Sequence, residues 1–170
     1  MPLLKTDEVA FVALGSNLGD SVRNVLRAFE KLEALSTKPI LRSSLWQTTP
    51  VDCPPGSPAF ANAMAGLFPL PGETPESLLR KLQAIEHEFG RQPKRMQNEA
   101  RPLDLDLIYF RGETRGTTEL TLPHPRAHQR RFVLQPLSEI APELILPGQA
   151  KSVRELLEGL PEDQSMRRLG

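Results

Sequence analysis

The stretch that decides the fold is Arg101-Pro102-Leu103-Asp104-Leu105-Asp106-Leu107-Ile108-Tyr109-Phe110, because two carboxylates interrupt a run that is otherwise apolar. The run predicts a β-strand, in which side chains alternate between two faces. Leu103, Leu105, Leu107 and Tyr109 are expected on one face, and Asp104 and Asp106 on the other, about 7 Å apart. Two carboxylates on one face of a core strand suit Mg²⁺ held against nucleotide phosphates. An edge strand with a solvated polar face is the alternative, and the strand alone does not decide between them.

Length and composition favour one domain over residues 1–170, because 170 residues with 39% hydrophobic side chains are enough for one real core. The 21 basic residues balance the 21 acidic ones, so no global field favours nucleic acid or an anionic membrane. The single cysteine, Cys53, excludes an internal disulfide framework. The sequence also lacks a signal-like start and a long apolar run. We expect a soluble, cytoplasmic monomer.

Apolar spacing predicts elements in the order β-α-β-β-α-β. Strands are expected at 9–14, 40–48, 60–68 and the Asp104/Asp106 stretch, with Phe60 and Asn62 on one strand face. One helix is expected from about 21 to 35, with an apolar stripe from Val22 to Leu32, and another after Thr74 with Pro75 at its first position. Residues 111–118 resemble a hairpin turn, after which 119–122 would pair back on the Asp104/Asp106 strand. The fold class is therefore α+β: a ferredoxin-like core with a mainly antiparallel sheet, helices on one face, and a C-terminal extension.

Basic residues flank the two carboxylates on both sides in the sequence. The loop 90–100 carries Arg91, Lys94 and Arg95, and a second basic segment runs from His124 to Arg131. A solvated basic face is the simpler interpretation of any one of these arginines. Together with the carboxylates they indicate a metal-bound polyphosphate, because the planar guanidinium holds phosphate oxygens in a bidentate way. The turn at 15–20 is interpreted as a plain turn, since it lacks the full phosphate-loop pattern.

Six motifs resemble, in order and spacing, those of the 6-hydroxymethyl-7,8-dihydropterin pyrophosphokinase family. They are Ala13-Leu14-Gly15-Ser16-Asn17-Leu18-Gly19-Asp20; Thr48-Thr49-Pro50-Val51; Phe60-Ala61-Asn62-Ala63; Glu86 with Gly90-Arg91; Arg101 to Leu107; and Leu122-Pro123-His124-Pro125-Arg126 continuing to Arg130-Arg131-Phe132-Val133-Leu134. The resemblance covers most of the chain. It implies an ATP- and Mg²⁺-dependent enzyme of folate biosynthesis that transfers pyrophosphate from ATP to 6-hydroxymethyl-7,8-dihydropterin and releases AMP.

The resemblance also implies roles for individual residues. Asp104 and Asp106 would bind two Mg²⁺ ions, and Arg91 and Arg101 would join them in catalysis. The residues expected around the pterin are Thr48, Pro50, Val51, Phe60, Asn62 and Phe132, and those expected around ATP are Gln83, Glu86, Arg91, Leu107, His124 and Arg130. The family's second arginine after Arg91 is absent at Pro93, as is a later one at Gln97, so we hypothesise that Lys94 or Arg95 supplies the missing charge. No general base is assigned.

Simpler interpretations stand beside these roles. Phe60 and Phe132 have the spacing of core residues, Glu86 that of a solvated helix position, and His124 that of a surface turn. A different ATP-dependent phosphoryl transferase would lack the pterin pocket. An RNA-binding domain shares the element order, but its third strand should carry a basic, glycine and aromatic signature that residues 60–68 lack.

Overall fold

The computed structural model of the protein describes residues 4–49, 59–90, 102–161 and 166–169. Its sheet has the strand order β5-β1-β4-β3-β8, with β2 also paired to β4, and every pairing is antiparallel. This order is compatible with the predicted ferredoxin-like core, since the four core strands β1, β3, β4 and β5 lie side by side as fourth, first, third and second in chain order. The elements are η1 (Thr6–Glu8), β1 (Ala10–Ser16), α1 (Ser21–Glu33), β2 (Leu41–Arg42), β3 (Leu45–Thr48), β4 (Phe60–Leu67), α2 (Pro75–Glu88), β5 (Asp104–Phe110), β6 (Arg115–Gly116), β7 (Thr121–Leu122), η2 (Ala127–Gln129), α3 (Arg131–Ile140), α4 (Val153–Glu158) and β8 (Met166–Leu169).

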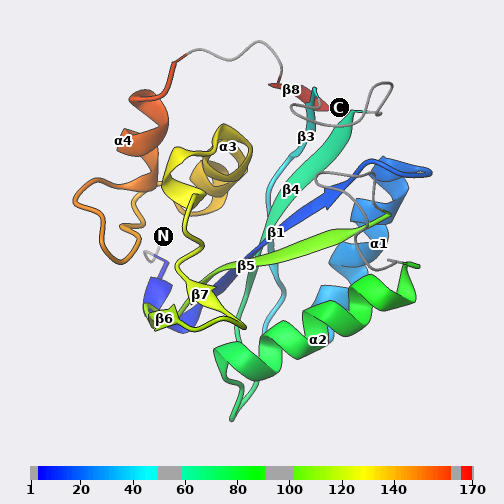
Figure 1. Cartoon of the computed structure of the whole chain (residues 1–170), viewed down its shortest axis with the longest axis horizontal. Coiled ribbons are helices and arrows are strands. Elements are labelled where there is room, and N and C mark those ends of the chain that lie inside the picture. Colours follow the sequence, from blue (N-terminus) through cyan, green and yellow to red (C-terminus); the bar gives the residue numbers. More distant parts are fainter. Residues whose placement is uncertain (1–3, 50–58, 91–101, 162–165, 170) are drawn as a thin grey trace.

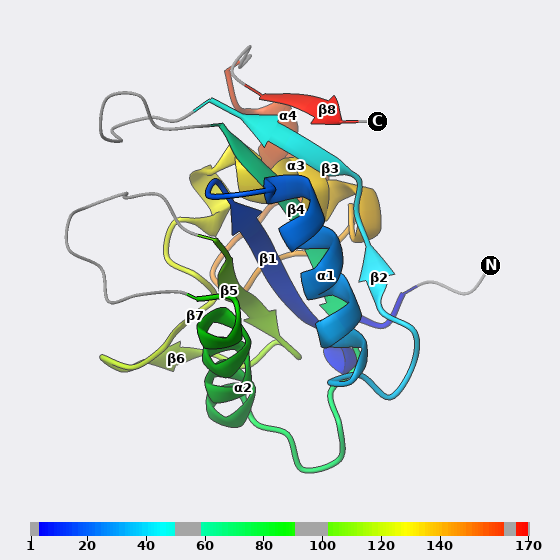
Figure 2. The ribbon, with the colours of Figure 1, turned by 90° about the vertical axis from the view of Figure 1, so that its right-hand side faces the viewer.

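Helices cover both faces of the sheet. Helices α1 and α2 lie on one face, as predicted, α3 from the C-terminal part of the chain lies on the other, and α4 packs against α3 (Figure 1; Figure 2). One buried cluster joins the sheet to α1 and α2 through Leu14, Phe29 and Leu82, among others. A second joins it to α3 through Phe11, Met64 and Leu134. Among the described residues, no helix has the length and apolar composition needed to cross a membrane.

The two core helices begin where the sequence predicts. Asp20 caps α1 by accepting a hydrogen bond from the Arg23 backbone N–H at 3.1 Å, and Thr74 caps α2 by accepting one from Ser77 N–H at 3.0 Å. The predicted stripe of α1 is only partly buried: Val25, Phe29 and Leu32 pack in the core, whereas Val22 and Leu26 stay exposed. The sheet therefore covers a narrower face of α1 than the apolar pattern suggests.

Strand β5 departs from simple alternation. The register shifts between Phe11 and Val12 of β1, so that Phe11 lies opposite Tyr109 and Val12 opposite Leu107, leaving Ile108 as the extra residue of a bulge. Leu103, Leu105 and Leu107 pack toward α1 and α2, but Tyr109 packs on the α3 face with Phe11. The prediction that Tyr109 shares a face with the three leucines is wrong, because the bulge reverses the alternation.

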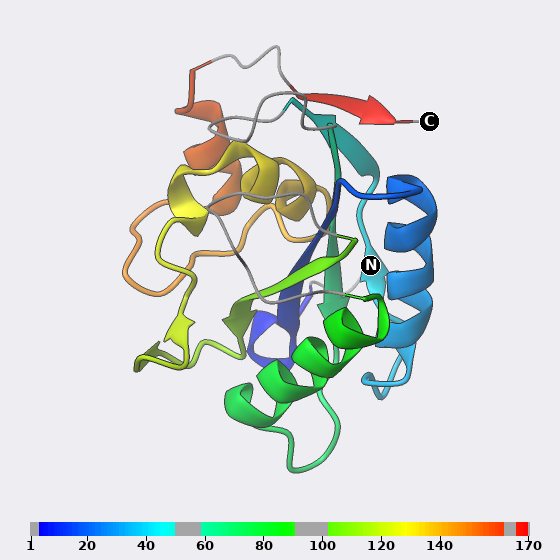
Figure 3. The same ribbon diagram turned by 45° about the vertical axis from the view of Figure 1, so that its right-hand side comes forward.

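The segment after β5 also differs from the prediction. Residues 121–122 (β7) pair with residues 115–116 (β6) in a separate two-stranded sheet, rather than with β5. Leu120 and Leu122 are buried in the core cluster of the α1/α2 face, so packing, more than strand pairing, holds this hairpin near β5. Figure 3 shows the hairpin projecting from the end of β5 beside α2.

Candidate active site

A row of side chains crosses four strands on the α3 face of the sheet. Asp104 of β5 lies opposite Gly15 of β1, Gly15 lies opposite Asn62 of β4, and Asn62 lies opposite Trp46 of β3. Residues directly opposite one another in a sheet point to the same face. The carboxylate of the edge strand and the amide of the central strand therefore share one surface. Asp106, two residues along β5, lies on it too.

The amide of Asn62 is held over Gly15. A Cβ at Gly15 would lie 3.2 Å from Asn62 Oδ1, so glycine at this position allows the amide to approach β1 closely. On its other side, Asn62 Nδ2 donates a hydrogen bond to Thr48 Oγ1 at 2.7 Å. Thr48 lies opposite Phe60 in the register of β3 and β4. The predicted pterin residues Thr48, Phe60 and Asn62 are therefore brought together at one end of these two strands.

Glu86 of α2 is buried, with only 8% of its surface exposed. Its Oε2 accepts a hydrogen bond from the backbone N–H of Leu105 at 2.7 Å. Leu105 stands between Asp104 and Asp106 on the edge strand of the sheet, and its N–H points away from β1. The solvated helix position considered for Glu86 is wrong, since its carboxylate fixes the strand that carries the two acids.

A cavity of about 250 Å³ lies along the same edge of β5. Leu105, Asp106 and Leu107 form its strand side, and Leu79 of α2, the hairpin residues 118–121 and His124 complete most of the wall. Gln83 lies one helical turn after Leu79 and is exposed. The predicted ATP residues Leu107 and His124 therefore meet the predicted metal ligand Asp106 at one cavity.

His124 is fixed relative to β5. Its backbone N–H donates to the Ile108 carbonyl at 3.1 Å, after a cis peptide bond between Leu122 and Pro123. Its Nδ1 accepts a hydrogen bond from the Arg126 backbone N–H at 3.3 Å, so we assign the neutral tautomer with the proton on Nε2. Burial, with the nearby charges of Arg130 and Arg126, lowers the pKa of His124 below its ordinary value of 6.5, against the opposing effect of Asp104. A neutral Nε2–H donor follows at physiological pH.

Phe132 and Arg130 lie at the start of α3. Phe132 is 40% exposed, and the Arg130 guanidinium carbon lies 5.4 Å from the centre of its ring. The core interpretation of Phe132 is therefore wrong, because a core ring would be buried. At the other end of α3, Glu139 accepts hydrogen bonds from Trp46 Nε1 at 2.8 Å and Ser44 Oγ at 2.7 Å. These bonds attach the helix that carries Phe132 to the strand that carries Thr48.

The remaining predicted site residues lie outside the described parts of the chain: Pro50, Val51, Arg91 and Arg101, with the candidate replacements Lys94 and Arg95. Within the described ranges, no group of three or more His, Cys, Asp or Glu side chains is arranged to hold a metal ion. Two features were missed from the sequence. The hairpin wall at 118–121 carries no motif, and the close approach of Gly15 to Asn62 depends on the register of two strands.

Comparison with known proteins identifies the family to which the chain is similar. The model of the 7,8-dihydro-6-hydroxymethylpterin-pyrophosphokinase (HPPK) family matches residues 11–142. A 2-amino-4-hydroxy-6-hydroxymethyldihydropteridine pyrophosphokinase from Haemophilus influenzae is 38% identical over 153 residues, covering 88% of this chain and 91% of its own. One from Pseudomonas aeruginosa is 37% identical over 154 residues, with 89% and 91% covered.

Longer proteins also match. The folic acid synthesis protein fol1 of Pneumocystis carinii is 34% identical over 152 residues, and the match spans 89% of this chain but only 20% of that protein. A crystal structure of an HPPK-DHPS in complex with substrates superposes with a TM-score of 0.73 at 14% identity, covering 94% of this chain and 46% of that one. This likeness confirms the fold.

The family model spans well over half of the chain, and the bacterial relatives are matched over nearly their full length. The chain therefore belongs to the 7,8-dihydro-6-hydroxymethylpterin-pyrophosphokinase family, and it is a transferase of folate biosynthesis, as its sequence predicts.

Proposed function

We propose that the chain transfers the pyrophosphoryl group of ATP to 6-hydroxymethyl-7,8-dihydropterin across the strand that carries Asp104 and Asp106. The observation that supports this most is the position of the two carboxylates. Asp106 lines the cavity at the edge of β5, and Asp104 stands in the row that leads through Gly15 to Asn62. A donor bound in the cavity and an acceptor bound at Asn62 would therefore meet above these two acids.

The cavity suits the nucleoside part of ATP. Leu79, Leu105 and Leu107 give it apolar walls for a flat base. Leu105 N–H points away from β1, and groups on a strand that point to one edge recur every second residue. The N–H and C=O of Leu107 therefore face the cavity, where they offer one donor and one acceptor to the edge of a base. Gln83, one helical turn after Leu79 on the same helix, is the candidate for a further contact with the nucleoside.

The acids suit a divalent cation bound together with the triphosphate. Mg²⁺ is commonly held by one or two carboxylates and substrate phosphates, with waters completing the shell, and needs no third protein ligand. Asp104 and Asp106 are both half-buried on one strand face, which is consistent with such a site. When bound there, Mg²⁺ would neutralise charge that develops on the phosphate oxygens. His124 Nε2–H and the Arg130 guanidinium would donate to phosphate oxygens beside it.

The acceptor is proposed to bind over Asn62. Asn62 is 7% exposed, its Nδ2 is oriented by Thr48, and its side-chain carbonyl faces Gly15. A buried amide with fixed partners can read the donors and acceptors along the edge of a pterin. Phe60 on the same strand face and the exposed ring of Phe132 are the candidate stacking surfaces on its two sides.

The reaction proposed is direct transfer. The hydroxymethyl oxygen of the pterin forms a bond to the β-phosphorus of ATP, the bond from that phosphorus to the oxygen bridging to the α-phosphate breaks, and AMP leaves. The hydroxyl proton passes to solvent or to a phosphate oxygen, since no residue is assigned as base. The chain contributes positioning and electrostatic stabilisation, which account for most catalysis in phosphoryl transfer.

The test is product analysis with purified protein, ATP, Mg²⁺ and the pterin alcohol. We expect AMP and the pterin diphosphate in equal amounts, with no AMP when the pterin is omitted. Formation of ADP would instead indicate a transferase of single phosphoryl groups. Absence of any nucleotide product from folded protein that binds ATP would contradict the proposal.

A further inference from the structure

The cavity at the edge of β5 has an outer wall that is small and separate from the main sheet. This wall is the β6–β7 hairpin, whose residues 118–121 line the cavity. Each strand of the hairpin has two residues, and a two-stranded ribbon of this size is not stable on its own. Contacts with the rest of the protein must therefore determine the position of this hairpin relative to the cavity.

Two kinds of contact hold the C-terminal side of the hairpin and its turn. Leu120 and Leu122 are buried in the core, which anchors the C-terminal side of the hairpin. Thr117 closes the turn, since its N–H donates to the Leu120 carbonyl and its Oγ1 accepts from Leu120 N–H, both at 3.0 Å. The turn bonds join residues within the hairpin only. They fix its shape but not its position against α2.

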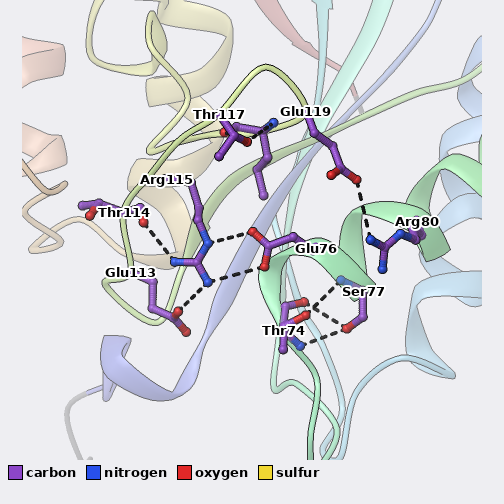
Figure 4. Close-up of polar contacts among 10 residues, drawn as sticks. Thr74, Glu76, Ser77, Arg80, Glu113, Thr114, Arg115, Thr117 and Glu119 are labelled. Carbon is purple, nitrogen blue, oxygen red and sulfur yellow. Dashed lines mark hydrogen bonds and ion pairs between the residues drawn. The ribbon is translucent and has the colours of Figure 1, made fainter.

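Within the described parts of the chain, the guanidinium of Arg115 attaches the N-terminal side of the hairpin to α2. Arg115 Nε donates to Glu76 Oε2 at 2.7 Å, and its Nη2 lies 3.4 Å from Glu76 Oε1 and 2.9 Å from Glu113 Oε1. Its Nη1 donates to the Thr114 carbonyl at 2.9 Å. Figure 4 shows the planar fork of Arg115 facing Glu76, with Glu113 on the far side. Nε and Nη2 therefore hold this side of the hairpin to α2, while the contacts with Thr114 and Glu113 fix the guanidinium within its own segment.

The electrostatics favour a persistent pair. The hydrogen bond to Glu76, and to a smaller extent the one to Glu113, raises the pKa of Arg115. The hydrogen bond from Arg115 lowers the pKa of Glu76. Side-chain exposures of 28% and 31% make this pair less accessible to water than most ion pairs on the surface. By contrast, Arg80 and Glu119 are 3.9 Å apart and largely exposed, so their pair contributes little.

We propose that Arg115, held by Glu76 and Glu113, is a positioning residue for nucleotide binding, because it keeps the hairpin wall of the cavity in its closed position against α2. This inference rests on the proposed function, which places the nucleoside of ATP in that cavity. When the ion pair between Arg115 and Glu76 is removed, the hairpin spends less time in the position that binds the nucleotide. The apparent affinity for ATP then falls in proportion to the fraction of molecules that remain competent to bind.

The experiment compares Arg115→Met and Glu76→Gln with wild type, using calorimetric titration with a non-hydrolysable ATP analogue and Mg²⁺ in the absence of pterin. Arg115→Met is expected to raise the Kd of the analogue about fivefold, and Glu76→Gln by a smaller factor. Arg154→Met is the matched control, because Arg154 of α4 forms an exposed ion pair with Glu143 (3.0 Å), and neither residue lines the cavity. It should leave the Kd within about twofold of wild type.

Steady-state kinetics separate positioning from a general loss of structure. We expect the KM for ATP to rise in parallel with the Kd, while kcat at saturating ATP and the KM for pterin stay within about twofold of wild type. Hydrogen exchange should become faster in residues 111–122 and stay unchanged in β1 and β4.

An unchanged Kd in folded Arg115→Met would overturn the inference, as would a rise in the KM for pterin as large as the rise in the KM for ATP. If wild type binds the analogue but makes no pterin diphosphate, the proposed function is refuted, while the Kd comparison still tests the positioning role of Arg115. If wild type makes the product and the variant binds the analogue as well as wild type does, only the positioning role of Arg115 is refuted.

Discussion

Glu86 provides the sharpest test of how the two acids are positioned. Its carboxylate is buried and accepts the Leu105 N–H at 2.7 Å, at the point of β5 between Asp104 and Asp106. A hydrogen bond to a charged group contributes about 1.5–3 kcal/mol, and leaving the N–H buried without its partner costs about 1–3 kcal/mol. We therefore expect Glu86→Ala to lose about 2–3 kcal/mol of unfolding free energy, or about 4–12 °C in Tm for a protein of this size.

The same substitution should impair turnover more than it impairs folding. Without the bond, the edge strand is free to shift, and a displacement of about 1 Å at reacting groups costs on the order of 100-fold in rate. Glu86→Gln keeps a carbonyl that accepts from Leu105 N–H, so it should lose only about 1 kcal/mol and retain most activity. The assays are urea unfolding, kcat with both substrates saturating, and the Kd of an ATP analogue.

Glu88 is the matched control, since it lies on the same helix in an exposed pair with Lys31 at 3.2 Å. Glu88→Ala should change stability by less than about 0.5 kcal/mol and leave turnover unaffected. Unchanged stability in Glu86→Ala would refute the structural role of the bond. A variant that loses stability but keeps full turnover would refute positioning. Loss of ATP affinity without loss of stability in both Glu86 variants would instead support the direct ATP contact that the family resemblance implies.

Three further predictions concern the site itself. Asp104→Asn and Asp106→Asn should each lower turnover by at least about 10³-fold, because an amide cannot replace a metal-binding carboxylate, while thermal unfolding stays near wild type. Asn62→Ala should raise the Kd for pterin by about 10- to 100-fold and leave the Kd of an ATP analogue unchanged, as measured by calorimetry. Because the pKa of His124 is lowered in the folded protein, the unfolded chain takes up the proton more readily as pH falls below 6.5. Wild type should then lose unfolding free energy relative to His124→Asn as the pH falls from about 7.5 to about 5.5, as measured by urea unfolding at each pH. Equal losses in the two proteins would refute the lowered pKa of buried His124.

Local sequence signals were enough to predict the core of the fold. The caps Asp20 and Thr74 and the apolar spacing of α2 fix helix positions through contacts within a few residues. The alternation of Phe60 and Asn62 with alanines likewise predicts the buried faces of β4, which the structure confirms. The bulge at Ile108 was not predictable, because it arises from the pairing of β5 with β1, almost a hundred residues away in the sequence.

In the candidate site, too, local sequence indicates some features, whereas others depend on contacts between residues far apart in the chain. Asp104, Asp106 and Asn62 could be singled out as candidates from the sequence, since carboxylates and an amide are unusual inside apolar strands. The contact of Glu86 with Leu105 was not, because a glutamate beside an apolar helical stripe has the same pattern whether it is solvated or buried. The hairpin wall of the cavity depends on Arg115 reaching Glu76, two residues on different elements that no short-range pattern connects.

Strand β5 shows why the site forms at this edge of the sheet. Among the described residues it is an edge strand, and edge strands expose backbone groups that invite pairing with other chains. Here the exposed edge is used at three successive places: Leu105 N–H binds Glu86, Leu107 faces the cavity, and the Ile108 carbonyl accepts the His124 N–H at the bulge. The same contacts block further strand pairing and create the proposed nucleotide site. A second partner strand for β5, added on this edge, would displace both Glu86 and His124, so the site requires that the sheet end at β5.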